Sequence, residues 1–136
     1  MSIADIEELP TKFPISLFME FIPKKADIRV FYYNSKFYST ILLSQDDRES
    51  KVDWRLGGDK IRNLSCQLTS KVENSLCNLL NDLNINNCSI DLIIGKNGAI
   101  YFLEINPEGQ FGLHTYKCNY AIESEIIQII NSNEQI

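Results

Sequence analysis

The chain lacks several residue patterns that would mark a particular class of protein. Its four cysteines form no C-x-x-C pair, which disfavours a zinc site. His114 is the single histidine, so the one Cys–His dyad that stays open as an alternative pairs it with Cys118. No apolar run approaches the length of about 18 residues that a membrane-spanning helix needs, and we therefore expect no membrane partner.

The charge and the N-terminal residues exclude further classes. With 18 acidic side chains against 13 basic ones, a net charge of −5, the chain lacks the basic face that nucleic-acid binding requires. We therefore expect no nucleic-acid partner. The first residues, MSIADIEELP, are acidic and contain no apolar core, unlike a secretory signal. We expect a cytoplasmic protein whose thiols are reduced.

Apolar residues are present in sufficient number to form one core. A length of 136 residues and a hydrophobic content of 44% predict a single domain that spans residues 1–136. The apolar pattern predicts a short acidic helix at 3–9, a strand at 16–22, a hairpin from 27–33 and 36–43, a helix at 68–83, a hairpin within 89–111 and a helix at 121–130. Hairpins imply antiparallel pairing. The predicted fold class is therefore α+β, a mainly antiparallel sheet with helices packed on one face.

Residues 44–63 form the one long polar stretch between the predicted elements. Such a stretch is either a solvated surface loop or a functional segment, and both interpretations stay open. Its most distinctive part is Asp53-Trp54-Arg55, which places the only tryptophan of the chain beside an arginine. An arginine can make bidentate contacts with phosphate, so Arg55 is a candidate phosphate ligand.

Three oxygen-bearing side chains stand out in the second predicted hairpin. Glu104 and Asn106 are two positions apart, so on a strand they project from the same face. A turn at Gly95-Lys96-Asn97-Gly98 sets Asp91 roughly opposite Glu104 on the partner strand. Charged groups within apolar strands are costly unless they are paired or bind a metal, and hard oxygen ligands suit Mg²⁺. The trio is therefore a candidate magnesium site, with acidic surface residues as the alternative.

Several of these segments together resemble a known family. The segments MEFIPKKADIRVFYY, VDWR and SIDLIIGKNGAIYFLEINPEGQFG resemble the C-terminal part of an ATP-grasp ligase. The combination of DIRVFYYNSKFYS, VDWR, EINPEGQFG and the trailing CNY resembles in particular the ATP-grasp peptide maturases, the graspetide or microviridin-type ligases and their grasp-with-spasm relatives. The resemblance extends from about Pro14 to Ile130.

The resemblance implies a role for eight residues, of which five concern metal and phosphate. Asp91, Glu104 and Asn106 match the positions that hold Mg²⁺ against the phosphates of ATP. Arg55 matches an arginine that contacts phosphate. Arg29 is expected to face the same cleft, toward the phosphates or an acyl phosphate, the alternative being a surface salt bridge.

The other three residues concern the nucleotide. Glu20 and Phe21 match the hinge segment that lies along the adenine, and Asp27 matches an acidic residue that contacts the nucleotide. In the family a carboxylate attacks the γ-phosphate of ATP, and a hydroxyl or amine then displaces phosphate from the acyl phosphate. For the maturases, the resemblance implies a ribosomal precursor peptide as the substrate and a side-chain ester or amide as the product.

One departure from the family is large. ATP-grasp enzymes clasp ATP between two subdomains, and nothing here matches the first one, which carries a Gly-rich loop and phosphate-binding lysines. Lys24 and Lys25 follow the hinge and cannot replace those lysines by position. We therefore expect a portion of a ligase that is inactive alone. The alternatives are a fragment of a small-molecule or amino-acid ligase and a non-catalytic nucleotide-binding module. The sequence predicts no oligomeric state.

Overall fold

The computed structural model describes residues 12, 14–15 and 19–133. The predicted helix at 3–9 and the first half of the predicted strand at 16–22 lie outside the described residues. For residues 19–22 the prediction of a strand is wrong, because these residues pair with no strand and form no regular structure. Met19 and Phe21 are exposed, so apolar content alone was a misleading signal here.

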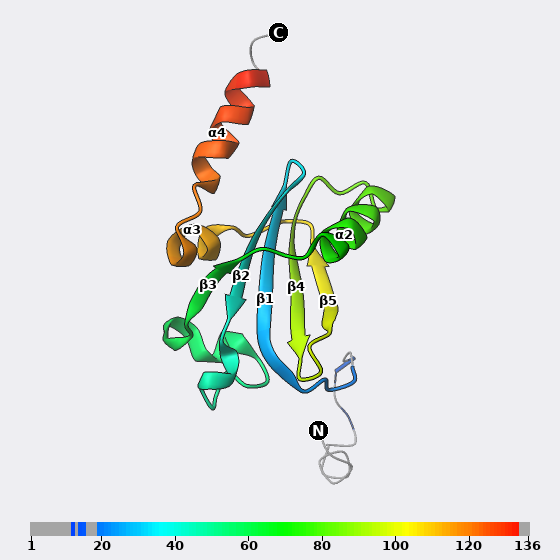
Figure 1. Ribbon diagram of the computed structural model, residues 1–136, viewed down its shortest axis with the longest axis vertical. Coiled ribbons are helices and arrows are strands. Elements are labelled where there is room, and N and C mark those ends of the chain that lie inside the picture. The colour runs from blue at the N-terminus through cyan, green and yellow to red at the C-terminus, as the bar shows by residue number, and fades with distance from the viewer. Residues whose placement is uncertain (1–11, 13, 16–18, 134–136) are drawn as a thin grey trace.

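A five-stranded sheet forms the centre of the fold, with the strands in the order β3-β2-β1-β4-β5 (Figure 1). The strands are β1 (Lys24–Tyr33), β2 (Lys36–Leu42), β3 (Asn63–Cys66), β4 (Asn87–Gly95) and β5 (Ile100–Asn106). All neighbouring pairs are antiparallel. The predicted α+β class with a mainly antiparallel sheet is confirmed.

Both predicted hairpins form. Asn34 and Ser35 connect β1 to β2 with φ angles of 47° and 64°, the left-handed pair that a type I′ turn needs to match the twist of its strands. The second turn lies between β4 and β5. Because β5 is an outer strand whose single strand neighbour within the described residues is β4, its apolar side chains Ile100, Phe102 and Leu103 stay partly exposed.

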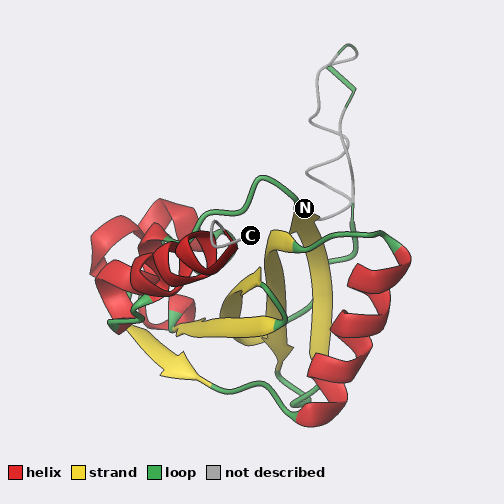
Figure 2. Cartoon of the chain, turned by 90° about the horizontal axis from the view of Figure 1, so that it is seen from above, coloured by secondary structure: helices red, strands yellow, loops and turns green. Residues whose placement is uncertain are grey.

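Helices contact both faces of the sheet. The predicted helix at 68–83 is α2 (Ser70–Asp82), and the predicted helix at 121–130 is α4 (Ile122–Asn133). α2 covers one face, where it packs on alternate side chains of β1 and β4, and the start of α4 covers the other face through Ile122 (Figure 2). The expectation that helices pack on one face therefore needs correction. The central strand β1 is apolar on both faces, with Ile28 and Val30 on one and Phe31 on the other, and both need cover.

Four short elements were not predicted. α3 (Gly112–Cys118) lies in the segment rich in glycine and aromatic residues, and β3 lies at the end of the polar stretch. That stretch also holds two 3-10 helices, η1 (Ser44–Asp46) and η2 (Trp54–Lys60). Each of these elements is too short to show a hydrophobic period in the sequence.

The four cysteines are free, as expected for reduced thiols. Among the described residues no helix is long and apolar enough to cross a membrane. The remaining alternative from the cysteine pattern, a dyad of Cys118 and His114, is not what the structure shows. Nδ1 of His114 lies 2.9 Å from Oγ1 of Thr40, and it is this Thr40 hydroxyl that contacts Sγ of Cys118, at 3.4 Å.

Candidate nucleotide and metal site

The β4–β5 hairpin brings the three predicted metal ligands together. Asp91 pairs directly with Glu104, and Ser89 pairs with Asn106 one step further along the same face. The three side chains line one cavity of about 200 Å³, together with Arg29, Arg55, Ser89 and Gln110. The register and the shared face that the sequence predicted are thus found in the structure. What these residues bind stays a prediction.

A β-bulge next to Asp91 shapes the site further. Asp91 pairs with Glu104 but Leu92 pairs with Phe102, so Leu103 is the extra residue on β5. A bulge re-aims side chains locally, and here Leu103 and Glu104 both line a larger neighbouring cavity of about 340 Å³. The bulge therefore places an apolar wall beside the acidic pair.

Two arginines face the acidic pair from different elements. Arg29 lies opposite Asp91 on β1, with its Nε 3.9 Å from Oδ1 of Asp91. Arg55 comes from η2 and places Nη2 at 3.5 Å from Oδ2 of Asp91 and 3.4 Å from Oε1 of Glu104. Only 11% of the Arg29 side chain is exposed, so its ion pair lies inside the cleft, which excludes the surface salt bridge considered as an alternative.

Trp54 lies against both arginines. The Arg29 guanidinium carbon is 5.4 Å from the ring centroid of Trp54, and that of Arg55 is 5.8 Å from it. Both distances are within the range of cation–π attraction. The Asp53 carboxylate accepts a hydrogen bond of 3.0 Å from the backbone N–H of Arg55, which caps η2 and fixes the direction in which Trp54 and Arg55 leave it.

The electrostatics of Asp91 favour a cation. Burial is the largest effect, and it raises the pKa of Asp91 above its ordinary value; the nearby Glu104 raises it further, while Arg29 and Arg55 oppose the rise. Oδ1 of Asp91 is buried without a hydrogen-bond partner. Buried carboxylate oxygens that lack a partner are costly, and a cation would remove that cost.

The donor set suits Mg²⁺ rather than a softer metal. No group of three or more His, Cys, Asp or Glu side chains gathers anywhere in the described part of the chain. The third predicted ligand is the amide of Asn106, whose Oδ1 also accepts a hydrogen bond from the backbone N–H of Glu108 at 3.1 Å. Two carboxylates and one amide oxygen leave coordination positions for phosphate and water, as Mg²⁺ sites usually do.

A buried network anchors the segment that carries Trp54 and Arg55. Lys24 donates to Oδ1 of Asp27 at 2.7 Å and to the backbone carbonyl of Val52 at 3.1 Å. The hydroxyl of Ser44 donates to the other oxygen of Asp27. Asp27 also lines the 340 Å³ cavity, so its expected contact with a nucleotide stays a prediction. In the structure its carboxylate ties β1 to the start of the polar stretch.

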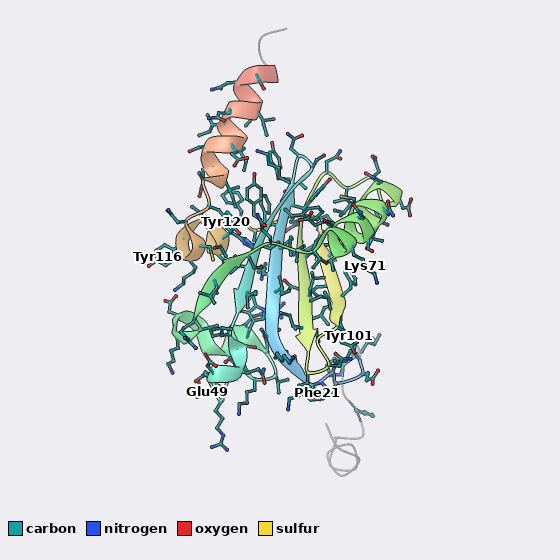
Figure 3. The ribbon with its side chains drawn as sticks, viewed as in Figure 1. Phe21, Glu49, Lys71, Tyr101, Tyr116 and Tyr120 are labelled. Carbon is teal, nitrogen blue, oxygen red and sulfur yellow. The ribbon has the colours of Figure 1, made fainter. Side chains whose placement is uncertain are left out.

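The two hinge residues lie at the neighbouring end of the sheet. Glu20 and Phe21 line a third cavity, of about 280 Å³, and Figure 3 shows Phe21 where β1 begins. This cavity shares Met19, Lys24, Val52 and Leu103 with the 340 Å³ cavity, so the two are neighbours. The predicted adenine segment thus lines a cavity next to the one that the acidic pair lines, and its role stays a prediction.

Two further residues of the site were not predicted. The hydroxyl of Ser89 accepts from the backbone N–H of Gln110 at 2.7 Å, and Oε1 of Gln110 lies 3.5 Å from Nη2 of Arg29. The loop can approach β4 this closely because Gly109 has a φ of 55° and no side chain. A Cβ there would lie 2.9 Å from Oδ1 of Asn87. The spacing of Ser89 two residues before Asp91 was the available signal for it.

The comparisons with known proteins point to one group of enzymes. No protein-family model and no curated protein matches the chain, but solved structures do. One is a RiPP-associated ATP-grasp ligase from Chryseobacterium gregarium, described in complex with ADP and a leader and core peptide. It is 30% identical over 66% of this chain and 28% of that chain, with a TM-score of 0.61.

Two other structures agree with it. The macrocyclase MdnC from Microcystis aeruginosa MRC, described as bound with precursor peptide MdnA, is 27% identical over 82% of this chain and 34% of its own, with a TM-score of 0.66. The ATP-grasp ligase PsnB, described as complexed with a minimal precursor, is 14% identical over 85% of this chain and 37% of its own, with a TM-score of 0.66, and shows the fold alone.

The chain spans about a third of the length of these proteins. Within that span, the antiparallel sheet follows the fold of enzymes that are all described as ATP-grasp ligases or macrocyclases. The resemblance inferred from the motifs is therefore confirmed, and the chain has the fold of part of an ATP-grasp ligase, similar to those associated with peptide maturation.

Proposed function

We propose that the chain is the metal- and phosphate-binding portion of an ATP- and Mg²⁺-dependent carboxylate ligase that modifies a ribosomal precursor peptide. The observation that carries the proposal is the joint placement of Asp91, Glu104 and Asn106 beside Arg29 and Arg55 in one cleft. A peptide substrate is proposed because several structural neighbours are described with leader or precursor peptides. A cytoplasmic location and a single domain over residues 1–136 are part of the same proposal.

The chemistry demands the charges that this cleft holds. A carboxylate that attacks the γ-phosphate of ATP brings two anions together, which requires concentrated positive charge. Bound Mg²⁺ supplies part of it by neutralising phosphate oxygens. Arg29 and Arg55 supply the rest from this chain, and a side-chain carboxylate of the peptide would become the acyl phosphate beside them. A hydroxyl or amine of the same peptide then displaces phosphate, giving an ester or an amide.

The proposal includes the expectation that the isolated chain does not turn over. The cleft supplies metal ligands and arginines, but catalysis also needs the opposite wall of the clamp to exclude water and orient the phosphates. We expect no ATP turnover when the isolated chain is mixed with a precursor peptide. Measurable ADP release that depends on the peptide would contradict this expectation.

Calorimetric titration with MgADP tests the binding site itself. Wild type should bind MgADP more tightly than ADP in the presence of a chelator, because Asp91, Glu104 and Asn106 need the metal to hold phosphate. Asp91→Asn should remove this metal dependence. Asp82→Asn is a matched control, since Asp82 ends α2, which packs on the opposite face, and it should bind as wild type does. Equal binding by wild type and Asp91→Asn would refute the metal assignment.

A further inference from the structure

Trp54 holds a special position in the cleft because its ring lies within cation–π distance of both arginines. It is the only tryptophan of the chain, and it lies between the 340 Å³ cavity and a smaller one lined by Leu113 and Lys117. The neighbouring segment is fixed by the Asp53 cap and by the hydrogen bond from Lys24 to the carbonyl of Val52. The backbone on both sides of Trp54 is thus anchored.

The arginines and a metal ion compete for the same oxygens. Nη2 of Arg55 contacts Oδ2 of Asp91 and Oε1 of Glu104, and Nε of Arg29 lies near Oδ1 of Asp91. Mg²⁺ binds carboxylate oxygens at about 2.0–2.1 Å, which leaves no space for a guanidinium on the same lone pairs. A metal bound there would displace Nη2 of Arg55 from Asp91 and Glu104, and it would neutralise the charge that attracts Arg29 to Asp91.

We propose that Trp54 is a positioning residue that keeps Arg29 and Arg55 at the edge of the cleft when Mg²⁺ takes their place on Asp91 and Glu104. The inference rests on the proposed function, because it concerns the same site. Cation–π attraction does not use the carboxylates, so it persists after they are occupied by metal. The two guanidiniums then stay next to the metal, where phosphate oxygens arrive, and their mutual repulsion is offset by the ring.

Two substitutions of Trp54 separate cation–π attraction from the filling of space. Trp54→Phe keeps an aromatic face, whereas Trp54→Leu keeps apolar volume and removes the π electrons. Two cation–π contacts, each taken at the strength of a solvent-exposed pair, correspond to roughly a five- to thirty-fold effect on affinity. Tyr116→Leu is a matched control, because Tyr116 is an exposed aromatic residue whose cation–π partner, Lys117, lies 5.1 Å from its ring and outside the metal site.

Calorimetric titration of the whole chain with inorganic tripolyphosphate in MgCl₂, and with MgCl₂ alone, tests the inference. Trp54→Leu should weaken tripolyphosphate binding by roughly five- to thirty-fold, and Trp54→Phe should stay within about three-fold of wild type. Mg²⁺ affinity should be unchanged in both, and Tyr116→Leu should behave as wild type. The NMR signals of the arginine Nε–H groups should lose their ring-current shift only in Trp54→Leu.

Three kinds of result would overturn the inference that Trp54 positions the two arginines. The first is that Trp54→Leu binds tripolyphosphate as tightly as wild type. The second is that Trp54→Phe is as weak as Trp54→Leu, or that Mg²⁺ binding falls in parallel, because the residue would then act through packing. The third is that wild type binds neither probe, which would refute the proposed function itself and the inference with it.

Discussion

The buried pair of Lys24 and Asp27 allows a quantitative prediction about stability. Their side chains are 7% and 8% exposed and lie 2.7 Å apart, and the Asp27 carboxylate also accepts from Ser44. Asp27→Asn keeps the shape and the Ser44 contact but leaves the Lys24 ammonium without its counter-charge. Breaking a buried ion pair on one side costs about 3–5 kcal/mol of unfolding free energy. Lys24 keeps the carbonyl of Val52, so we expect the lower end, about 3 kcal/mol.

The double variant shows whether the cost arises from the unpaired charge. Lys24→Met combined with Asp27→Asn removes both charges from the buried site, and we expect it to be more stable than Asp27→Asn alone, since a buried pair replaced by neutral groups is often nearly neutral. Urea unfolding at pH 7, followed by circular dichroism, measures the stability of Asp27→Asn, of Lys24→Met and of the double variant. The difference between the double variant and the sum of the single ones gives the coupling energy.

A matched exposed pair provides the control. Lys117 and Asp59 lie 2.8 Å apart, but the Asp59 side chain is 92% exposed, so Asp59→Asn should leave the stability nearly unchanged. The reasoning is refuted if Asp27→Asn behaves like Asp59→Asn, or if the double variant loses as much stability as the two single variants together. Either result would mean that water reaches Lys24 and that the network does not anchor the polar stretch.

Three further predictions follow from the titrating groups. Burial lowers the pKa of His114 from 6.5 to about 4, so the unfolded chain binds a proton on this histidine at a higher pH than the folded chain does. The free energy of unfolding should therefore fall by roughly 3 kcal/mol as the pH drops from 6.5 toward 4. His114→Gln should lack this loss when urea unfolding at pH 7 and pH 4.5 is compared. Burial raises the pKa of the Cys88 and Cys66 thiols to about 11. Iodoacetamide at pH 7.5 should therefore label Cys88 only after unfolding, which mass spectrometry would detect. Rapid labelling of Cys88 in the native protein would contradict this prediction. The pKa of Asp91 lies above its ordinary value, so Mg²⁺ binding should release protons in mildly acidic buffer and should weaken as the pH falls. Calorimetry in buffers of different ionisation enthalpy detects the released protons.

The sequence predicted the parts of the site that local rules determine. Turn position and strand alternation are local, and they placed Asp91 opposite Glu104 and turned Arg29 away from Ile28 into the cleft. The bulge at Leu103 was not predicted, because nothing in the apolar run IYFLEIN distinguishes the extra residue from its neighbours. It depends on how β5 pairs with β4 on both sides of the site.

The parts that the sequence did not predict depend on contacts between distant segments. The approach of Trp54 to Arg29 requires the polar stretch to fold back over β1, and the Lys24–Asp27–Ser44 network that directs it joins residues that no periodic pattern relates. The expectation of helices on one face was wrong in the same way. The alternation along β1 shows that both faces are apolar, but which helix covers which face depends on chain connections.

The position of β5 at the margin of the sheet has a consequence for the ordering of the three proposed metal ligands. Glu104 and Asn106 belong to a strand with a single partner, whereas Asp91 belongs to an inner strand held on both sides. Local opening that detaches β5 would remove two of the three oxygens and leave the third in place. A bound cation would then hold β5 against β4, and the measured affinity for the cation would include the free energy of pairing β5 with β4.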